Sequence, residues 1–412
     1  LKPEAFRIRE AALADRRATL IEGDERGLMY GAFKLAEPHL PPSIQRALTD
    51  PRVELSFADG RSLVRSLARA DTMRFDLLLV VVPDPDTAAL NRYFTADFYR
   101  TASQLIADDG VLATRISSGD NVLGTELASY GASVQESLRS AFAEVLLIPG
   151  EESWFVAGRR TGRASVDPTV LARRYRSMPV GERHFPAEGF HSLLDPERIR
   201  FVSNVYRGQA LGDRDELVNR DARPVTYFLN LLVLGRHTGS AAVGVLRACR
   251  GVGMWLVALP LLALVLLRMH RLTEGGGRRR RDRHNGSMML MAIGLSSIAL
   301  EIVLLFAFQS RFGVLYQQVG LVSALFMVGL ALGAAVAMTR SHGRPSGGRP
   351  PMVVRGARPG LYVSALCTGL ALVMPGLLDS LGTLGPNAAK LAYYGLFLLT
   401  GVLSGAAFPY AT

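Results

Sequence analysis

The apolar runs differ between the two halves of the chain. In the first half they are short and separated by charged residues, and the longest, Leu77–Val82, contains only Leu and Val. Such a run predicts a parallel β-strand that is buried on both faces. From about residue 251 onward, the runs are long enough to cross a membrane and alternate with Arg-rich loops. The pattern predicts an α/β part followed by membrane helices.

The end of the strand at Leu77–Val82 is the first candidate site. Pro83-Asp84-Pro85 follows the strand directly, and proline cannot continue a ladder of hydrogen bonds. Apolar residues at helical spacing then predict a helix over 94–105, and a second strand follows over 111–116. Ligands of open α/β sheets bind beyond the carboxyl ends of the strands, so Asp84 is a candidate functional residue.

A second candidate site follows a short strand predicted at Ala18–Ile21. This strand is followed by Glu22-Gly23-Asp24. An acidic residue at a strand end commonly binds a ribose hydroxyl in nucleotide-binding α/β folds. Glu22 and Asp24 are therefore candidate nucleoside ligands, and the alternative is that they are solvated turn carboxylates.

Two more features complete the predicted sheet. Val53–Ala58 alternates and leads into Asp59-Gly60, a second pairing of an acid with a flexible residue at a strand end. A plain turn explains Asp59 and Gly60 equally well. Glu144–Ile148 and Ser153–Ala157, which flank a Pro-Gly turn, predict an antiparallel hairpin that closes the sheet.

The central unit resembles the spermidine synthase (polyamine aminopropyltransferase) family. In that family, a strand that ends in Asp-Ser-Ser-Asp-Pro precedes a Phe-Thr-x-Glu-Phe-Tyr-like helix start and a Gly-Val-Leu strand. Phe94-Thr95-Ala96-Asp97-Phe98-Tyr99 and Asp109-Gly110-Val111-Leu112 match these elements. The resemblance implies a Rossmann-like α/β fold with a methyltransferase-type sheet. Its first strand and Gly-rich loop are absent, and we expect an N-terminally truncated fragment.

The resemblance also implies a reaction and its ligands. An aminopropyl group would pass from decarboxylated S-adenosylmethionine to a polyamine or another small cationic amine. Glu22 and Asp24 would belong to the nucleoside site, Asp59 and Gly60 would contact the adenine, and Asp84 would face the amine as the candidate catalytic residue. No metal is expected.

One position departs from the family pattern. When Asp84-Pro85 is aligned with the final Asp-Pro of the family loop, Val81 occupies the position of the catalytic Asp. A general base typically contributes about 10²–10⁴ in rate, so we expect a weak or inactive transferase. Two alternatives remain open because fold does not fix function. One is a non-enzymatic membrane sensor or carrier of a small cationic or nucleoside-like ligand, and the other is an S-adenosylmethionine-dependent methyltransferase.

The net charge of +11 does not indicate nucleic acid as a partner. Much of the arginine excess lies in loops beside apolar segments, which is typical of the positive-inside pattern of membrane proteins. Cys249 and Cys367, the two cysteines, show no metal-ligand spacing and imply no disulfide framework. The sequence leaves the oligomeric state open.

The domain organisation follows from these patterns. We expect an α/β domain over 1–160, an Arg-rich connecting region over 161–250 and a transmembrane domain over 251–412, placed in the bilayer of the bacterial inner membrane. Five spans are predicted: Gly251–Leu267, Met288–Phe308, Val319–Met338, Leu361–Leu381 and Leu391–Phe408.

Two arguments disagree on which side of the membrane the α/β domain lies. The loops Arg268–His284 and Arg340–Arg358 are rich in arginine and should face the cytoplasm, which would leave the domain outside. Derivatives of S-adenosylmethionine are made in the cytoplasm, which favours the opposite side. From the sequence we expect a cytoplasmic domain. Glu301, inside a predicted span, is expected to serve polar packing between helices.

Overall fold

A computed structural model describes most of the α/β half and three long helices of the membrane half. The described residues are 6–13, 16–23, 41–48, 50–54, 56, 59–119, 123–178, 185–210, 214–239, 243–244, 246, 248, 266, 270, 278–312, 316–342, 369–370, 373–374, 376–378, 380–381 and 384–411. They fall into two compact units, Leu1–Met73 and Arg74–Thr412.

The first unit contains a β-hairpin and two helices. Strand β1 (Phe6–Leu13) pairs antiparallel with β2 (Arg16–Gly23), and the helices are α2 (Pro42–Leu48) and α3 (Gly60–Ala70). The predicted strand at Ala18–Ile21 is confirmed within β2. Its length was underestimated, however, so Glu22 lies inside the strand, opposite Arg7, and not beyond its end.

The strand predicted at Val53–Ala58 is wrong at the positions that the structure describes. Val53, Glu54 and Ser56 belong to no strand. The Val53 N–H donates to the carbonyl of Asp50 at 2.9 Å, which closes a turn in place of an extended segment. Alternating apolar residues are weak evidence for a strand when turn-forming residues precede them directly.

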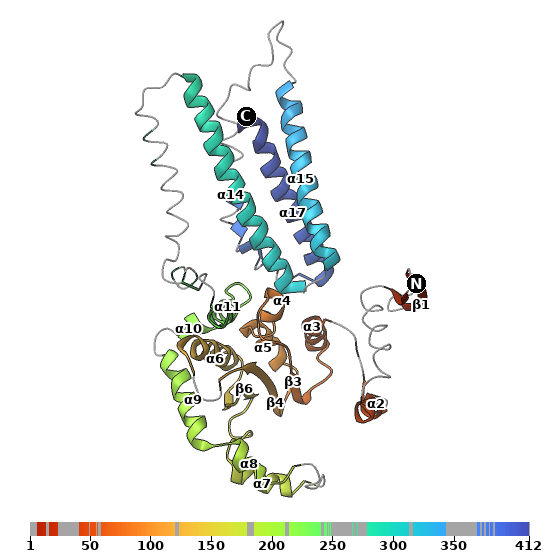
Figure 1. Cartoon of the computed structure of the whole chain (residues 1–412), viewed down its shortest axis with the longest axis vertical. Coiled ribbons are helices and arrows are strands. Elements are labelled where there is room, and N and C mark those ends of the chain that lie inside the picture. The colour runs from red at the N-terminus through yellow and green to blue at the C-terminus, as the bar shows by residue number, and fades with distance from the viewer. Residues whose placement is uncertain are drawn as a thin grey trace. The chain divides into compact units, whose positions relative to one another are not determined.

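The second unit contains a four-stranded mixed sheet in the order β3-β4-β6-β5 (Figure 1). Its strands are β3 (Phe75–Val80), β4 (Ile106–Ser117), β5 (Glu144–Ile148) and β6 (Glu152–Gly158). β3 and β4 are parallel, whereas β4–β6 and β5–β6 are antiparallel, which confirms the predicted closing hairpin. The mixed α/β sheet confirms the predicted fold class.

Asp108, Asp109 and Gly110 precede the strand predicted over 111–116, but in the structure they lie within β4, at an irregularity of its pairing with β3. Phe75 pairs with Ile106 but Leu77 pairs with Val111, so four residues of β4 lie between two partners that are two residues apart on β3. A side chain at Gly110 would come within 2.6 Å of the Phe75 carbonyl oxygen. Glycine is therefore required where the two backbones approach each other.

The prediction that the first sheet strand is buried on both faces is wrong. Val80 is buried, but Leu77, Leu79 and Val81 are 58%, 53% and 50% exposed. Successive side chains of a strand point to opposite faces. Because α5 and α6 pack against β4, β5 and β6, one face of the sheet is covered there, whereas Leu77 and Leu79 of β3 are exposed.

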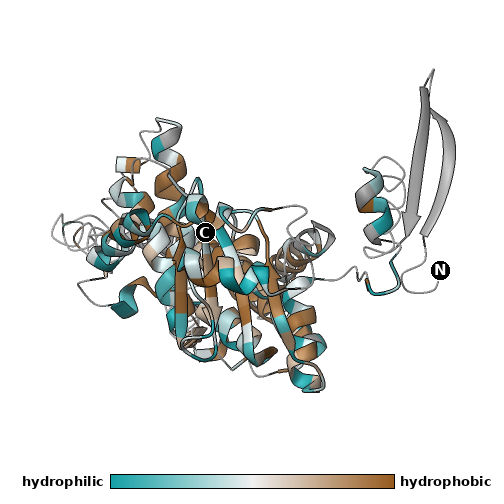
Figure 2. Cartoon of the chain, turned by 90° about the horizontal axis from the view of Figure 1, so that it is seen from below, coloured by the Kyte–Doolittle hydropathy of each residue, from teal (hydrophilic) through white to brown (hydrophobic). Residues whose placement is uncertain are grey.

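Helices cover the sheet and continue through the region that the sequence did not resolve into elements. They are α4 (Ala88–Asn91), α5 (Ala96–Ser103), α6 (Thr125–Arg139), α7 (Pro168–Arg176), α8 (Gly189–Leu193), α9 (Pro196–Gln209), α10 (Arg214–Leu217) and α11 (Val225–His237). The predicted helix over 94–105 is confirmed by α5, whose N-cap Thr95 accepts from the Phe98 N–H at 3.2 Å. Hydrophobic residues lie in the strands of the four-stranded sheet and also in helices around it (Figure 2).

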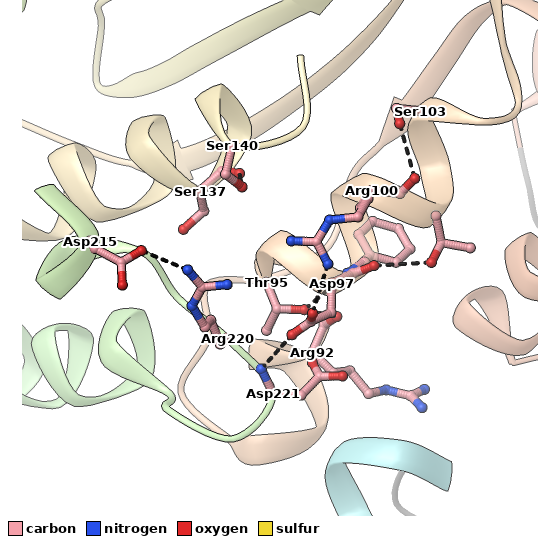
Figure 3. Close-up of polar contacts among 12 residues, drawn as sticks. Arg92, Thr95, Asp97, Arg100, Ser103, Ser137, Ser140, Asp215, Arg220 and Asp221 are labelled. Atoms are coloured by element: carbon pink, nitrogen blue, oxygen red, sulfur yellow. Dashed lines mark hydrogen bonds and ion pairs between the residues drawn. The ribbon is translucent and has the colours of Figure 1, made fainter. Parts of the chain in front are cut away.

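A buried asparagine anchors the segment that leads from the α/β fold into α11. The Nδ2 amide of Asn219 donates to Asn91 Oδ1 and to the Phe94 carbonyl, both at 3.0 Å. The backbone N–H of Asp221 donates to Asp97 Oδ2 at 3.0 Å (Figure 3). A buried amide that lost these partners would cost about 1–3 kcal/mol, so the segment is held firmly on α4 and α5.

Three helices are long and apolar enough to cross a membrane: α14 (Arg278–Phe312), α15 (Tyr316–His342) and α17 (Pro386–Ala411). Their positions, lengths and compositions agree with three of the predicted spans. The spans predicted at Gly251–Leu267 and Leu361–Leu381 lie mostly outside the described residues. On α14, an exposed apolar stripe recurs at helical spacing, as expected of a surface that faces lipid; its members are Met291, Leu295, Ile298 and Ile302.

Glycines bring α15 and α17 into backbone contact. A side chain on Gly333 would overlap the Val402 carbonyl, and one on Gly405 would overlap the Leu330 carbonyl. Gly401 would likewise place a side chain 3.1 Å from the Cα of Gly329. Small residues four apart let helix backbones approach closely in a membrane. The two helices therefore interlock through glycines contributed by both.

Replacing one interlocking glycine should loosen this pair. We expect Gly333→Ala to lower the free energy of unfolding in detergent by about 1–3 kcal/mol, because the added methyl group overpacks the contact. Gly395→Ala is the matched control, since a side chain there meets no atom within 4 Å. Alanine favours the helix over glycine, so the control should be neutral or stabilising. Equal effects of the two substitutions would contradict the interlock.

Candidate active site

Asp84 is held at the end of the sheet by two hydrogen bonds. Its Oδ1 accepts from the backbone N–H of Ser117 at 3.0 Å and from the hydroxyl of Tyr130 at 2.9 Å. Ser117 is the last residue of β4 and Tyr130 lies in α6. The half-buried carboxylate therefore ties the loop after β3 to both the neighbouring strand and the covering helix.

Three buried tyrosines lie near this carboxylate. Tyr99, Tyr130 and Tyr206 are each at most 1% exposed. Burial raises the pKa of Tyr130 well above its usual value, and the charge of Asp84 raises it further. Burial also raises the pKa of Tyr99 and of Tyr206. All three phenols are neutral at physiological pH, so Tyr130 acts towards Asp84 as a hydrogen-bond donor.

Close packing around Tyr206 fixes α6 in place. Its ring stacks on Phe155 of β6, with 6.5 Å between the ring centroids. The same ring lies so close to Gly131 that any side chain there would collide with it. Because Gly131 follows Tyr130 in α6, this contact also fixes the position of Tyr130, whose hydroxyl binds Asp84.

Val81 directly follows the last residue of β3 and carries no proton acceptor. It continues the exposed series of Leu77 and Leu79. The loop over 81–87 contains two acids, Asp84 and the exposed Asp86, whose N–H donates to the Asp84 carbonyl at 2.8 Å. The carboxylate at this strand end is therefore that of Asp84, three residues beyond Val81. One of its oxygens already accepts hydrogen bonds from Ser117 and Tyr130.

Sequence reasoning identified Asp84 but missed its partners. Ser117 and Tyr130 lie 33 and 46 residues further along the chain. No local motif marks either residue, because a backbone N–H has no sequence signature and a single Tyr in a helix is ordinary. Only the parallel pairing of β3 with β4, which brings their carboxyl ends together, pointed to Ser117.

The predicted nucleoside ligands lie in the first unit, apart in sequence from Asp84. Asp59 is the N-cap of α3, and its Oδ1 accepts from the Ser62 N–H at 2.9 Å, next to Gly60 as the first helical residue. This is a structural cap, which the sequence reading had not considered. Glu22 lies in β2, and Asp24 lies outside the described residues. Their roles as ligands stay predictions.

The buried tyrosines predict a loss of stability at high pH. Their folded-state pKa values lie above the unfolded value of about 10, so the stabilisation is complete below pH 10 and is lost as the pH rises further. Each such group contributes up to about 1.4 kcal/mol per pH unit. Thermal unfolding midpoints between pH 8 and pH 11 measure this effect.

Tyr130→Phe separates the contribution of the Asp84 partner. It should cost about 1–3 kcal/mol at neutral pH, because Asp84 loses one donor. Its midpoint should then fall less steeply than that of the unmodified protein above pH 10, since one titrating phenol is gone. Identical alkaline slopes for both proteins would contradict the buried environment of Tyr130.

Comparison with known proteins shows what part of this chain is similar to. Residues 35–148 match the family model described as Spermine/spermidine synthase domain. A polyamine aminopropyltransferase of Shewanella oneidensis is 33% identical over 111 residues, which are 25% of this chain and 19% of that protein. Polyamine aminopropyltransferase 2 of Ralstonia nicotianae is 27% identical over 197 residues, which are 47% of this chain and 36% of that protein.

The similarity extends to an archaeal relative. A polyamine aminopropyltransferase of Korarchaeum cryptofilum is 24% identical over 179 residues, which are 43% of this chain and 52% of that protein. The chain thus spans about a half or less of the length of these relatives. The residues matched by the family model include the loop with Asp84 and the strands β3, β4 and β5. Residues 35–148 are therefore similar to a spermine/spermidine synthase domain.

Proposed function

We propose that this chain is a membrane-anchored spermidine synthase-like protein that binds a polyamine or similar small cation at Asp84. We propose further that it is a weak or inactive aminopropyltransferase. The observation that carries the proposal is the strand end, where Val81 offers no base and Asp84 is already tied to Ser117 and Tyr130. The relatives support the substrate class, because their names are those of polyamine aminopropyltransferases.

The reaction of those relatives defines what the site lacks. The nitrogen of an amine attacks the methylene carbon beside the sulfonium of decarboxylated S-adenosylmethionine, so a C–N bond forms while the C–S bond breaks. The sulfur leaves as a neutral thioether and the amine must lose a proton. A polyamine is mostly protonated at neutral pH, so a base near the reacting carbon is needed both before and after the attack.

Asp84 fits cation binding better than proton transfer. Both of its observed hydrogen bonds go to Oδ1, which leaves Oδ2 as the oxygen for a ligand ammonium. Hydrogen bonds to a charged group contribute about 1.5–3 kcal/mol, enough to hold one end of a polycation. The flanking Pro83 and Pro85 limit movement of this loop towards the position of Val81.

The nucleoside part of the proposal rests on the first unit. Glu22, Asp24, Asp59 and Gly60 are the residues that would hold decarboxylated S-adenosylmethionine or S-adenosylmethionine. Of these residues, Asp59 also caps α3, where its Oδ1 accepts from the Ser62 N–H.

A second candidate function is non-enzymatic binding of a small cation by a membrane sensor or carrier. The missing base favours it, since binding needs the Asp84 carboxylate but no proton transfer. The three long apolar helices are consistent with a membrane protein.

We propose the bacterial inner membrane as their location, because membrane-spanning helices belong there and not among the β-barrels of an outer membrane.

Restoring the acid should reveal whether a transferase site persists. With putrescine and decarboxylated S-adenosylmethionine, we expect little turnover by the unmodified chain and a gain of about 10²-fold or more for Val81→Asp. Val81 is half exposed, so the substitution should leave the fold intact. Product spermidine and thioether nucleoside are measured by chromatography.

Val81→Asn is the matched control, because it has the shape of Asp without its basicity. It should remain as slow as the unmodified protein. Robust turnover by the unmodified protein would show that another residue serves as base and would overturn the proposal. If Val81→Asp shows no gain in turnover, the result would favour the non-enzymatic alternative.

A further inference from the structure

The direction in which α14 runs shows which end of the helix bundle lies beside the four-stranded sheet. α4 contacts α14, and the ring of Tyr227 in α11 lies 6.2 Å from that of Phe306 (Figure 1). The four-stranded sheet of the second unit and its helices therefore lie beside the C-terminal part of α14. The N-terminal turns begin at Arg278, so the residues over 278–281 are separated from Phe306 by about 38 Å or more of helix. That length exceeds the ~30 Å hydrocarbon core of a bilayer.

The next helix returns to the same distant end. α15 begins at Tyr316, a few residues after α14 ends at Phe312, and runs to His342. It contains a 20-residue window, Gly320–Thr339, apolar enough to cross a membrane. α14 therefore begins, and α15 ends, at the end of the helix bundle opposite the four-stranded sheet. In the sequence, the segment 268–284 includes the start of α14 and the segment 340–358 includes the end of α15.

The basic residues are distributed unequally between these two ends. The segments 268–284 and 340–358 contain seven and five arginines. At the other end, the basic residues beside the apolar helices are three among the described residues: Arg236, Arg311 and Lys390. Short loops rich in Lys and Arg stay in the cytoplasm, whereas large domains are translocated largely regardless of their charge.

We infer that the α/β domain lies on the extracytoplasmic side of the membrane. This reverses the placement expected from the sequence, which relied on where the cosubstrate is made. Both observations that carry the inference concern the membrane half, and neither depends on the chemistry at Asp84. An extracytoplasmic domain would not meet a cytoplasmic sulfonium cosubstrate, which agrees with the loss of the base at Val81 and favours ligand binding over transfer.

Cysteine accessibility in intact cells tests this placement. The full chain, with Cys249 and Cys367 replaced by Ala, is expressed in a bacterial host as two single-cysteine variants. Thr161→Cys marks the α/β domain, where residue 161 is exposed, and Ser346→Cys marks the arginine-rich segment after α15. A membrane-impermeant maleimide is applied to spheroplasts, and the same reagent is applied after permeabilisation to establish that each cysteine can react.

The expected result is that Thr161→Cys reacts in intact spheroplasts and Ser346→Cys reacts only after permeabilisation. The reverse pattern would place the α/β domain in the cytoplasm and overturn the inference. Reaction of both cysteines in intact spheroplasts would show that the bundle does not separate them across a membrane, which would also overturn it. Neither outcome depends on catalytic activity, so failure here is distinguishable from failure of the proposed function.

Discussion

The hydrogen bonds accepted by Asp84 hold the candidate site in place. One carboxylate oxygen receives the Ser117 N–H from the end of β4 and the Tyr130 hydroxyl from α6. The loop after β3, the neighbouring strand and the covering helix therefore share a single acceptor. Since Tyr130 is buried, removing that acceptor would leave its hydroxyl without a partner in a medium where such a loss costs about 1–3 kcal/mol.

The same constraint limits the chemistry of the site. A carboxylate that serves as an anchor keeps its position, which suits binding of a cation, but it cannot readily move towards a reacting amine. At the strand end itself, Val81 supplies neither charge nor a proton acceptor. We therefore propose that the site keeps the electrostatic part of an amine-binding centre and lacks the group that would accept a proton. The inferred extracytoplasmic placement agrees with that loss.

The sequence predicted those parts of the fold that local patterns specify. The hairpin of β5 and β6, the helix capped by Thr95 and the apolar helices α14, α15 and α17 each carry a clear periodicity or a cap. The predictions from the sequence failed where contacts between residues distant in the chain determine the structure. Leu77 and Leu79 look like core residues, yet they are exposed because side chains alternate between the two faces of β3. Glu22 looked like a strand-end acid because its pairing with β1 left no local signal.

The candidate site was predictable only in part, for the same reason. Pro83 and Pro85 marked the end of the strand, and therefore Asp84, from the sequence alone. Tyr130 and Ser117 reach Asp84 only through the stacking of α6 and the register of β4. The interlocking glycines of α15 and α17 are spaced four apart in the sequence, but their contacts and the identity of the partner helix came from the structure.

The central claim is that the charge of Asp84 holds a cationic amine, and calorimetric titration of the purified full chain with spermidine tests it most directly. In Asp84→Asn, the side-chain oxygen can still accept from Ser117 and Tyr130, so the loop keeps its hydrogen bonds while the charge is lost. The account predicts that affinity falls about tenfold or more in this variant, whereas Val81→Ala binds like the unmodified protein. Unchanged affinity in a correctly folded Asp84→Asn protein would contradict it.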